Sequence, residues 1–368
     1  MVKILHTADC HLGSPIVGLT PAASAVRRQH LSSAFNDMLD KAKEQSVDVM
    51  LIAGDLFDNE YAAPSTVKRL NDFALENKNI RIIITPGNHD CIMGNKCYET
   101  LNADNITVFD SGEIECVDMP RLNLTVYGVG NMDAHSERRI LRDFYVRDVS
   151  RINIMCCHGL ITGQGGHALY NPITKEDIAG SGLDYLALGH VHAYSDIVHL
   201  GNVSYAYPGC ILGRGFDEQG QKGFIMGNID KGITDLEFIK SDYPSFRRVY
   251  VDCTDACDMT DLLSRAEKCC ADIPDADFVS LVLDGRIKSE LVINRTVVKD
   301  ALRRFSFIKV ADKTLPRQDY MEMINEPTLK GLFIRSVLES GLEENEAQKA
   351  ISIGLAALCG EELNMDEY

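Results

Sequence analysis

The sequence lacks any apolar stretch of the roughly 18 residues that a membrane-spanning helix needs, so no span is expected. The apolar run over residues 1–6 is shorter than the core of a signal peptide, and Asp9 follows it at once. Internal repeats and low-complexity tracts are also missing. These absences argue against a helix that spans the membrane, and they lead us to expect a cytoplasmic globular protein.

Positive charge is scarce. The chain has 37 Lys and Arg residues against 54 Asp and Glu residues, which gives a net charge of −17 and a pI of about 5.0. This balance argues against a protein that holds nucleic acid by itself through a broad basic surface. A nuclease is not excluded, because bound divalent cations and a partner subunit can supply the missing positive charge.

The cysteines lack the spacing of a zinc ribbon. The chain has 12 of them, among them the adjacent pairs Cys156-Cys157 and Cys269-Cys270, while Cys253 and Cys257 have no second pair at a suitable distance. We therefore expect free thiols in a reducing compartment rather than a disulfide framework or a structural metal site.

Three apolar runs alternate with two helical patterns in the first part of the chain. Strands are expected at residues 2–7, 47–53 and 80–84, and helices are expected to begin at Pro21 and Pro64. This alternation predicts an α/β fold, a layered sandwich of β-sheets flanked by helices. Functional sites in such folds lie beyond the carboxyl ends of the strands.

The rest of the chain divides by its pattern into three domains, over residues 1–243, 244–315 and 316–368. Further strands are expected at 124–129, 152–157 and 185–188 in the first domain, before a region of short β runs separated by glycine. The second is expected to be a small α+β cap domain, and the third a linker followed by two amphipathic C-terminal helices. Those helices could pack on their own domain or dock on a partner.

Polar residues able to bind metal follow the expected strands, each at the point where an apolar run stops. The candidates are Asp9, His11, Asp55, Asn88, His158, His190 and His192. Imidazole and carboxylate groups without cysteine suit manganese, iron or zinc better than calcium. Since their number exceeds what one tetrahedral ion needs, two ions that share Asp55 accommodate the set.

Each motif alone has a simpler explanation. Asp9-x-His11 could be incidental, and Gly54-Asp55 could be an ordinary turn after a strand. The stretch Gly87-Asn88-His89-Asp90 is more informative, because three polar groups directly after a buried strand are costly without a function. The occurrence of all these motifs in order, at successive strand ends, predicts a metal and phosphate site.

In this order the motifs resemble those of the calcineurin-like metallophosphoesterase superfamily. The resemblance implies that Asp9, His11, Asp55 and His192 hold one ion, and that Asp55, Asn88, His158 and His190 hold the other. It also implies catalytic roles for His89, which would protonate the leaving oxygen, and for Asp58, which would orient the imidazole of His89. Asp90 is expected to hold the turn.

Two further stretches are similar to those of SbcD-type DNA double-strand-break repair nucleases. One is the opening, residues 6–15, and the other comprises Tyr207-Pro208-Gly209-Cys210 with Arg214 to Glu218. The resemblance implies a manganese-dependent exonuclease or endonuclease that hydrolyses phosphodiesters with a metal-activated water. It also implies an SMC-like coiled-coil ATPase partner (SbcC-type), DNA as a second partner, and a homodimer formed through helices near residues 65–77 and 96–101. Phosphate contacts in the cap are assigned to Arg286, Lys288, Arg295 and Lys299, which could equally be solvated surface residues.

Two other functions are compatible with the sequence. The same metal residues would serve a phosphodiesterase or phosphatase acting on nucleotides or other small phosphate esters, and the acidic composition favours this alternative. The cap domain argues against this alternative, because small substrates do not require it. A binding subunit with weak or no catalysis, in which the metals mainly order a scaffold, is the second alternative.

Overall fold

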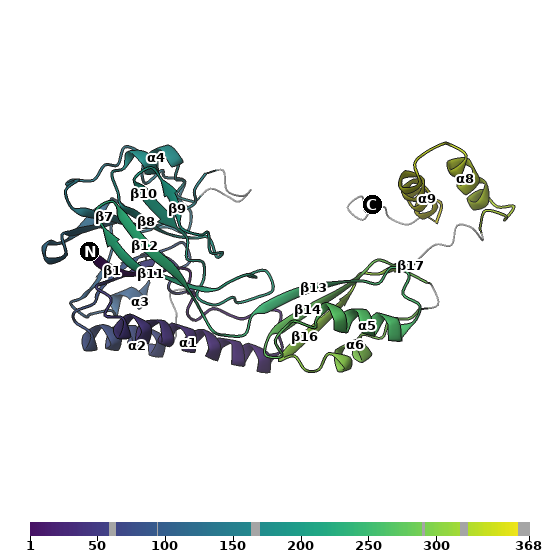
Figure 1. Ribbon diagram of the computed structural model, residues 1–368, viewed down its shortest axis with the longest axis horizontal. Coiled ribbons are helices and arrows are strands. Elements are labelled where there is room, and N and C mark those ends of the chain that lie inside the picture. The colour runs from purple at the N-terminus through teal and green to yellow at the C-terminus, as the bar shows by residue number, and fades with distance from the viewer. Residues whose placement is uncertain (59–63, 94, 163–169, 289–290, 317–322, 360–368) are drawn as a thin grey trace. The chain divides into compact units, whose positions relative to one another are not determined.

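The computed structural model describes residues 1–58, 64–93, 95–162, 170–288, 291–316 and 323–359 (Figure 1). The chain forms two compact units. Unit 1 comprises residues 1–248, 274–279 and 305–307, and unit 2 comprises residues 249–273, 280–304 and the chain from 308 onward. The division into three domains at 243 and 315 stays a prediction.

Unit 1 contains two six-stranded mixed sheets. The first has the order β12-β11-β1-β2-β3-β4. Its strands are β1 (Val2–Thr7), β2 (Val49–Ala53), β3 (Arg81–Thr85), β4 (Ile106–Val108), β11 (Gly223–Asp230) and β12 (Ile233–Lys240). Strands β1 to β4 are parallel, so their carboxyl ends share one edge, whereas β11 runs antiparallel to β1.

The second sheet has the order β5-β6-β7-β8-β10-β9. Its strands are β5 (Glu115–Met119), β6 (Leu124–Gly128), β7 (Ile152–His158), β8 (Tyr185–Gly189), β9 (Val198–Leu200) and β10 (Val203–Ala206). Strands β6, β7, β8 and β10 are parallel. Consequently β7 and β8 also end at one edge.

The two sheets pack face to face through an apolar core. Ile4 and Leu51 of the first sheet belong to the same buried cluster as Val126 and Ile154 of the second. Strands β1, β2 and β7 are buried along nearly their whole length, as expected of strands covered on both faces. This packing brings the carboxyl ends of strands from both sheets together.

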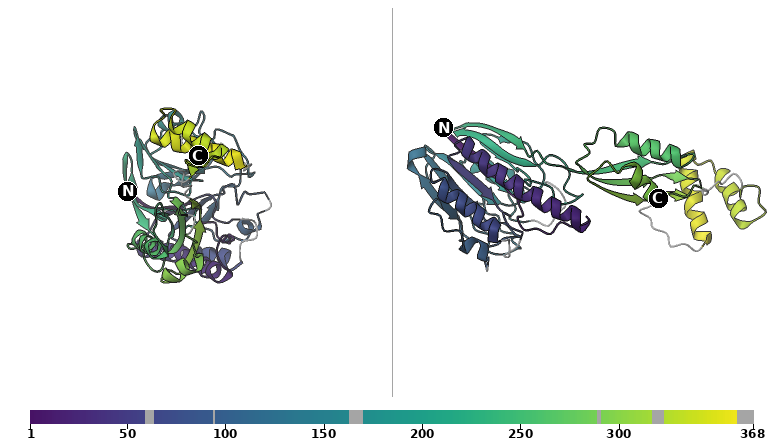
Figure 2. Two further views of the ribbon diagram at one scale, coloured as in Figure 1. Left: turned by 90° about the vertical axis from the view of Figure 1, so that its right-hand side faces the viewer. Right: turned by 90° about the horizontal axis from the view of Figure 1, so that it is seen from below.

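Two helices cover the outer face of the first sheet. Helix α1 (Pro21–Glu44) begins with proline after the cap residue Thr20, whose hydroxyl accepts a hydrogen bond from the N–H of Ala23. Helix α2 (Pro64–Glu76) lies beside it, as two views show (Figures 1 and 2). Both contribute to a core cluster that includes Leu39 and Phe73. The shorter helices of unit 1 are α3 (Lys96–Glu99), α4 (Lys175–Gly180) and the 3₁₀ turn η1 (Pro120–Leu122).

The expected α/β layered fold is therefore confirmed, with mixed sheets flanked by helices. The remaining strands form a three-stranded sheet with the order β13-β14-β16 and a two-stranded sheet, β15-β17. Their strands are β13 (Phe246–Asp252), β14 (Phe278–Asp284), β15 (Arg286–Ile287), β16 (Phe307–Asp312) and β17 (Leu315–Pro316), and the helices are α5 (Met259–Cys269) and α6 (Arg295–Ala301).

Two helices, α8 (Leu329–Leu338) and α9 (Glu344–Cys359), form a hairpin near the C-terminus. Its small core contains Ile334, Ile351 and Leu355. The predicted linker and the last residues of the predicted third domain lie partly outside the described residues, at 317–322 and 360–368. Among the helices of the described part of the chain, none has the length and apolar character needed to cross a membrane.

Candidate metal centre

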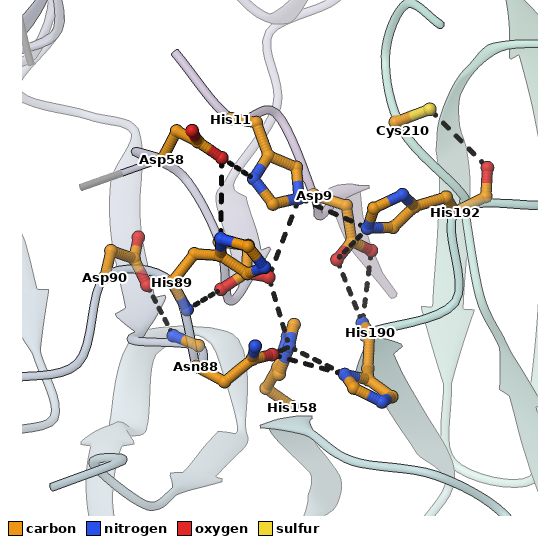
Figure 3. Close-up of polar contacts among 12 residues, drawn as sticks. Asp9, His11, Asp58, Asn88, His89, Asp90, His158, His190, His192 and Cys210 are labelled. Carbon is orange, nitrogen blue, oxygen red and sulfur yellow. Dashed lines mark hydrogen bonds and ion pairs between the residues drawn. The ribbon is translucent and has the colours of Figure 1, made fainter. Parts of the chain in front are cut away.

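The predicted site residues meet where strands from both sheets end (Figure 3). Asp9 and His11 follow β1, Asp55 follows β2, and Asn88 and His89 follow β3. From the second sheet, His158 ends β7, and His190 and His192 follow β8. The structure therefore brings together residues that lie as much as 183 positions apart in the sequence, Asp9 and His192 being the extremes.

The backbone at the site is strained. Asp9, His11, Asp55 and His190 have positive φ values of 49°, 45°, 49° and 101°. Non-glycine residues rarely adopt this region, which costs on the order of 1–3 kcal/mol each. Strain at four neighbouring site residues indicates that the fold places their side chains for a purpose other than stability.

Glycines allow the turns to approach one another closely. A Cβ atom on Gly87 would lie 2.1 Å from Asp55 Oδ1, and one on Gly54 would lie 2.1 Å from His158 Nδ1. Because Gly54 also has a φ of +91°, a side chain is excluded there for two reasons. Gly54 and Gly87 are thus needed for Asp55, His158 and the turn after β3 to approach one another.

One group of side chains surrounds a common point. His11 Nε2 lies 3.2 Å from His192 Nε2 and 3.6 Å from Asp55 Oδ2, and His192 Nε2 lies 3.8 Å from Asp9 Oδ1. One potential ligand atom from each of these four residues lies within 4.8 Å of the other three. Such spacing suits ligands that are each about 2.0–2.2 Å from one ion.

A second group adjoins the first through Asp55. His158 Nε2 is 3.0 Å from Asn88 Oδ1, 3.3 Å from His190 Nδ1 and 3.5 Å from Asp55 Oδ2. His190 Nδ1 is 3.3 Å from Asn88 Oδ1. Asp55 Oδ2 is therefore nearly equidistant from His11 Nε2 and His158 Nε2, which is compatible with its predicted role as a carboxylate that two ions would share.

The tautomers fit metal ligands. His11 Nδ1 lies 2.9 Å from an Asp58 oxygen, and His192 Nδ1 lies 2.8 Å from a Glu218 oxygen. Since carboxylates accept hydrogen bonds, both Nδ1 atoms carry a proton, so the Nε2 atom of each neutral ring presents a lone pair. Burial opposes protonation of His192, but its hydrogen bond to Glu218 and the charge of Asp9 raise its pKa above the usual value. The 3.2 Å between the two Nε2 atoms therefore suits either a metal ion bound by both rings or a proton on His192 that is donated to His11.

The electrostatics also fit metal ions. Burial lowers the pKa of His11 to about 4, of His158 to about 3 and of His190 to about 4, so these imidazoles are neutral, as ligands must be. Burial raises the pKa of Asp9 to about 7, because the carboxylate has lost water. A cation would compensate this buried negative charge. The chain thus holds a His/Asp cluster typical of dimetal phosphoesterases.

His89 lies at the open side of the cluster, with 46% of its side chain exposed. Its backbone N–H donates to Asp55 Oδ1 at 2.8 Å. Asp58 Oδ1, the predicted partner of the His89 ring, lies 3.5 Å from His89 Nδ1 but 2.9 Å from His11 Nδ1. The hydrogen bond of Asp58 is therefore made to His11, and its carboxylate faces His89 at a longer distance.

Asp90 holds the turn, as expected. Its buried carboxylate accepts hydrogen bonds from the N–H groups of Gly87 (2.6 Å) and Phe57 (3.0 Å) and from the Tyr98 hydroxyl (2.5 Å). Burial raises the pKa of Asp90 to about 7. These bonds tie the turn after β3 to the turn after β2.

Glu218 and Arg214 also belong to the site, although no catalytic or metal-binding role was predicted for them from the sequence. Glu218 accepts the proton of His192 and hydrogen bonds from Arg214, which also donates to Asp58 Oδ1 and Ser14 Oγ at 3.2 Å each. Burial opposes ionisation of Glu218, but His192 and Arg214 hold its pKa well below the usual range. In the sequence, both residues belong to the stretch Arg214 to Glu218. This stretch does not follow an expected strand, so the rule that picks polar residues at strand ends does not find them.

The four predicted DNA contacts all lie in unit 2. Arg286 is in β15 and Lys288 follows it, while Arg295 and Lys299 lie one turn apart on α6. Lys288, Arg295 and Lys299 are exposed. Their role in binding DNA stays a prediction.

The sequence of this chain matches the family of calcineurin-like phosphoesterases over residues 2–194. This match covers more than half of the chain, and it includes all the strand-end residues described above. The chain belongs to the calcineurin-like phosphoesterase family. It is accordingly a metal-dependent phosphoesterase, a hydrolase whose substrate the family does not define.

The individual relatives share less than 30% of their residues with this chain over the aligned regions. The chain is 29% identical over 276 residues to the uncharacterized metallophosphoesterase YhaO of Bacillus subtilis, and the aligned region covers 72% of this chain and 67% of YhaO. It is 26% identical over 270 residues to the DNA double-strand break repair protein Mre11 of Methanopyrus kandleri (66% and 57%). It is 26% identical over 285 residues to a subunit of the nuclease SbcCD of Staphylococcus epidermidis (66% and 73%). The chain thus spans little more than half the length of that Mre11 protein.

Proposed function

We propose that the protein is a dimetal DNA nuclease that hydrolyses phosphodiester bonds in DNA repair. The observation that carries the proposal is the position of Asp55 Oδ2, 3.6 Å from His11 Nε2 and 3.5 Å from His158 Nε2. A carboxylate between two sets of imidazoles is the arrangement of a two-ion phosphoesterase site. The likeness to a repair protein and to a nuclease subunit supports DNA as the substrate.

The proposed ligands fall into two sets. Asp9, His11, Asp55 and His192 would hold one ion, and Asp55, Asn88, His158 and His190 would hold the other. Two divalent ions, manganese or else iron or zinc, would supply Lewis-acid activation of water and neutralise phosphoryl charge.

His89 and Asp58 are the two proposed catalytic residues that would not bind the ions. The half-exposed imidazole of His89 can reach a substrate and would donate a proton to the leaving oxygen. Asp58 would fix the ring of His11 by its hydrogen bond, and its Oδ1 atom, 3.5 Å from His89 Nδ1, would help to orient the His89 ring.

Hydrolysis of small phosphate esters is the second candidate, and the net charge of −17 favours it. Activity with manganese on linear duplex DNA, single-stranded DNA and bis(4-nitrophenyl) phosphate separates the candidates. Cleavage of DNA that His89→Ala abolishes, with metal content unchanged, would support the nuclease. Turnover of the small ester without any DNA cleavage would reject it.

The α8–α9 hairpin is the proposed docking segment for a coiled-coil ATPase subunit. Leu329 and Leu332 of α8 are 66% and 56% exposed although they are large and apolar, as expected of a face that a partner helix covers. The paired variant Leu329→Ser with Leu332→Ser should abolish co-purification with a co-expressed coiled-coil ATPase candidate that binds the unmodified protein, and should leave hydrolysis of the small ester intact. Retained co-purification would reject this assignment.

A homodimer through α2 and α3 also stays a proposal. Leu75 on α2 is 47% exposed and is a candidate contact. Sedimentation should give the mass of a dimer at micromolar concentration, and Leu75→Glu should lower it to the monomer. A monomer in the unmodified protein would contradict the proposal.

A further inference from the structure

A cavity of about 380 Å³ lies between α1, α2 and the turn after His11. Its size is within the range of roughly 300–1,000 Å³ that is usual for pockets that bind small molecules. The turn contributes Leu12, Gly13 and Ser14, while α1 contributes residues between Arg28 and Asn36. The beginning of α2 forms the opposite side. The turn that forms one wall directly follows His11, a candidate metal ligand.

The floor of the cavity is apolar and its rim is rich in hydrogen-bond donors. Leu12, Leu31 and Phe35 are at most 4% exposed and form the floor. Ser32 on α1 and Ser65 on α2 are exposed hydroxyls at the rim. Such a surface suits a flat, partly apolar group that also carries polar edges.

The charge of the cavity is opposite to that of the chain as a whole. Arg28 and Arg69 line it, and none of the described lining residues is acidic. The guanidinium of Arg69 is bound by Asn36 at 3.0 Å and Asp40 at 3.1 Å. Arg28 is exposed and forms no ion pair with any carboxylate that the structure describes. A lone cation at the rim of an apolar cavity suits a phosphate on an otherwise apolar ligand.

A chain of polar contacts connects the cavity to His89, the proposed general acid at the metal centre. Ser14, a wall residue, accepts a hydrogen bond from Arg214 Nη1 at 3.2 Å. The same Nη1 donates to Asp58 Oδ1 at 3.2 Å, and Asp58 Oδ1 lies 3.5 Å from His89 Nδ1. Two side chains, those of Arg214 and Asp58, thus lie between the cavity wall and His89, the proposed general acid.

We propose that this cavity binds the nucleoside of the leaving group, with its base on the apolar floor and a neighbouring phosphate at Arg28. The inference rests on the proposed nuclease function, since it assigns a subsite to that reaction. It gives a role to the two arginines, Arg28 and Arg69, that line a cavity whose described residues include no carboxylate.

The test measures binding rather than turnover. The probes are 2′-deoxyadenosine 5′-monophosphate, which has a base and a phosphate, and inorganic phosphate, which reaches the metals alone. Their dissociation constants are measured by calorimetry on the full manganese-loaded chain. Arg28→Gln removes the rim charge, and Ser32→Trp fills the cavity from an exposed helix position. Lys43→Gln and Lys43→Trp are matched controls, because Lys43 is exposed on α1 outside the cavity.

We expect Arg28→Gln and Ser32→Trp each to weaken binding of the nucleotide about tenfold, while binding of inorganic phosphate changes by less than twofold. The Lys43 variants should resemble the unmodified protein. Unchanged nucleotide binding in both cavity variants would overturn the proposal, and so would an equal loss for inorganic phosphate. Loss of nucleotide binding together with a change from dimer to monomer would assign the cavity to a contact between copies and would also overturn it.

This result is independent of the nuclease assay. If the cavity variants behave as expected but the protein cleaves no DNA, the subsite serves small nucleotides and only the proposed DNA substrate fails. If the protein cleaves DNA but the cavity variants bind the nucleotide as the unmodified protein does, only the proposed subsite is rejected.

Discussion

The guanidinium of Arg214 donates to the carboxylate of Asp58, with Nη1 at 3.2 Å from Oδ1. The other side of the same guanidinium binds Glu218, with Nη2 at 2.7 Å from Oε1. Asp58 orients His11 and Glu218 orients His192, so one arginine connects the two carboxylates that fix two imidazoles of the same proposed ion. Arg214, Asp58 and Glu218 therefore orient the proposed metal ligands, although none of the three is itself a proposed ligand.

Arg214→Gln should weaken metal binding. Without the cation, Asp58 and Glu218 lose a shared donor in a half-buried environment, and the two Nε2 atoms are no longer held 3.2 Å apart. Losses of roughly 10- to 100-fold in metal affinity are typical when such an orienting partner is removed. Titration of the metal-free protein with manganese measures the change. Arg142→Gln, at a residue whose side chain is 67% exposed, is the control, and equal affinities in the two variants would contradict the role of Arg214.

His89→Asn should lower DNA cleavage by roughly 10²- to 10⁴-fold, the usual contribution of a general acid. Metal content should not change, because His89 is outside both proposed ligand sets. The loss should be smaller for bis(4-nitrophenyl) phosphate, since 4-nitrophenolate leaves without needing a proton. Comparison of kcat for the two substrates is the measurement, and an equal loss for both would show that His89 does not act as the acid.

Much of the site could be predicted because its residues obey a simple rule. Asp9, Asp55 and His158 each follow a buried apolar run, and the parallel strands that carry them end at one edge of a layered fold. Period and burial are local properties of the sequence, so they can be read without a structure.

Other features depend on contacts that no local pattern encodes. Strand β11 inserts beside β1 in antiparallel register, with Ile4 opposite Gly227, and this pairing of distant segments positions the loop that contains Glu218. Asp58 was expected to orient His89, but its hydrogen bond goes to His11, because the turn after β2 meets the turn after β1 through the Leu12 and Phe57 backbones. Such choices follow from tertiary packing.

Gly87→Ala should destabilise the protein by about 2–3 kcal/mol, since overpacking against a fixed neighbour is among the costly substitutions. The new Cβ would lie 2.1 Å from Asp55 Oδ1 and 2.5 Å from the Asp55 backbone nitrogen, so either Asp55 or the turn after β3 must move. Urea unfolding measures the effect. Gly180→Ala is the matched control, because nothing lies within 4 Å of its Cβ, and it should be neutral or slightly stabilising. Similar free energies for the two variants would contradict the proposed close approach.

His6 should make stability fall in acid. Its side chain is fully buried, with Nδ1 at 2.9 Å from the Tyr185 hydroxyl and Nε2 at 3.2 Å from the Leu188 carbonyl oxygen. Burial lowers its pKa from 6.5 to about 3. Below about pH 6.5 the unfolded chain therefore binds a proton that the folded chain does not, and the free energy of unfolding decreases as the pH falls toward 3. This one group should remove about 1 kcal/mol between about pH 6 and pH 5. Urea unfolding of the metal-free protein and of His6→Gln at both pH values isolates the contribution, since the titration of every other histidine is common to the two proteins. The difference in unfolding free energy between them should shift by about 1 kcal/mol in favour of His6→Gln at the lower pH, and a difference that is independent of pH would mean that His6 is protonated within the fold.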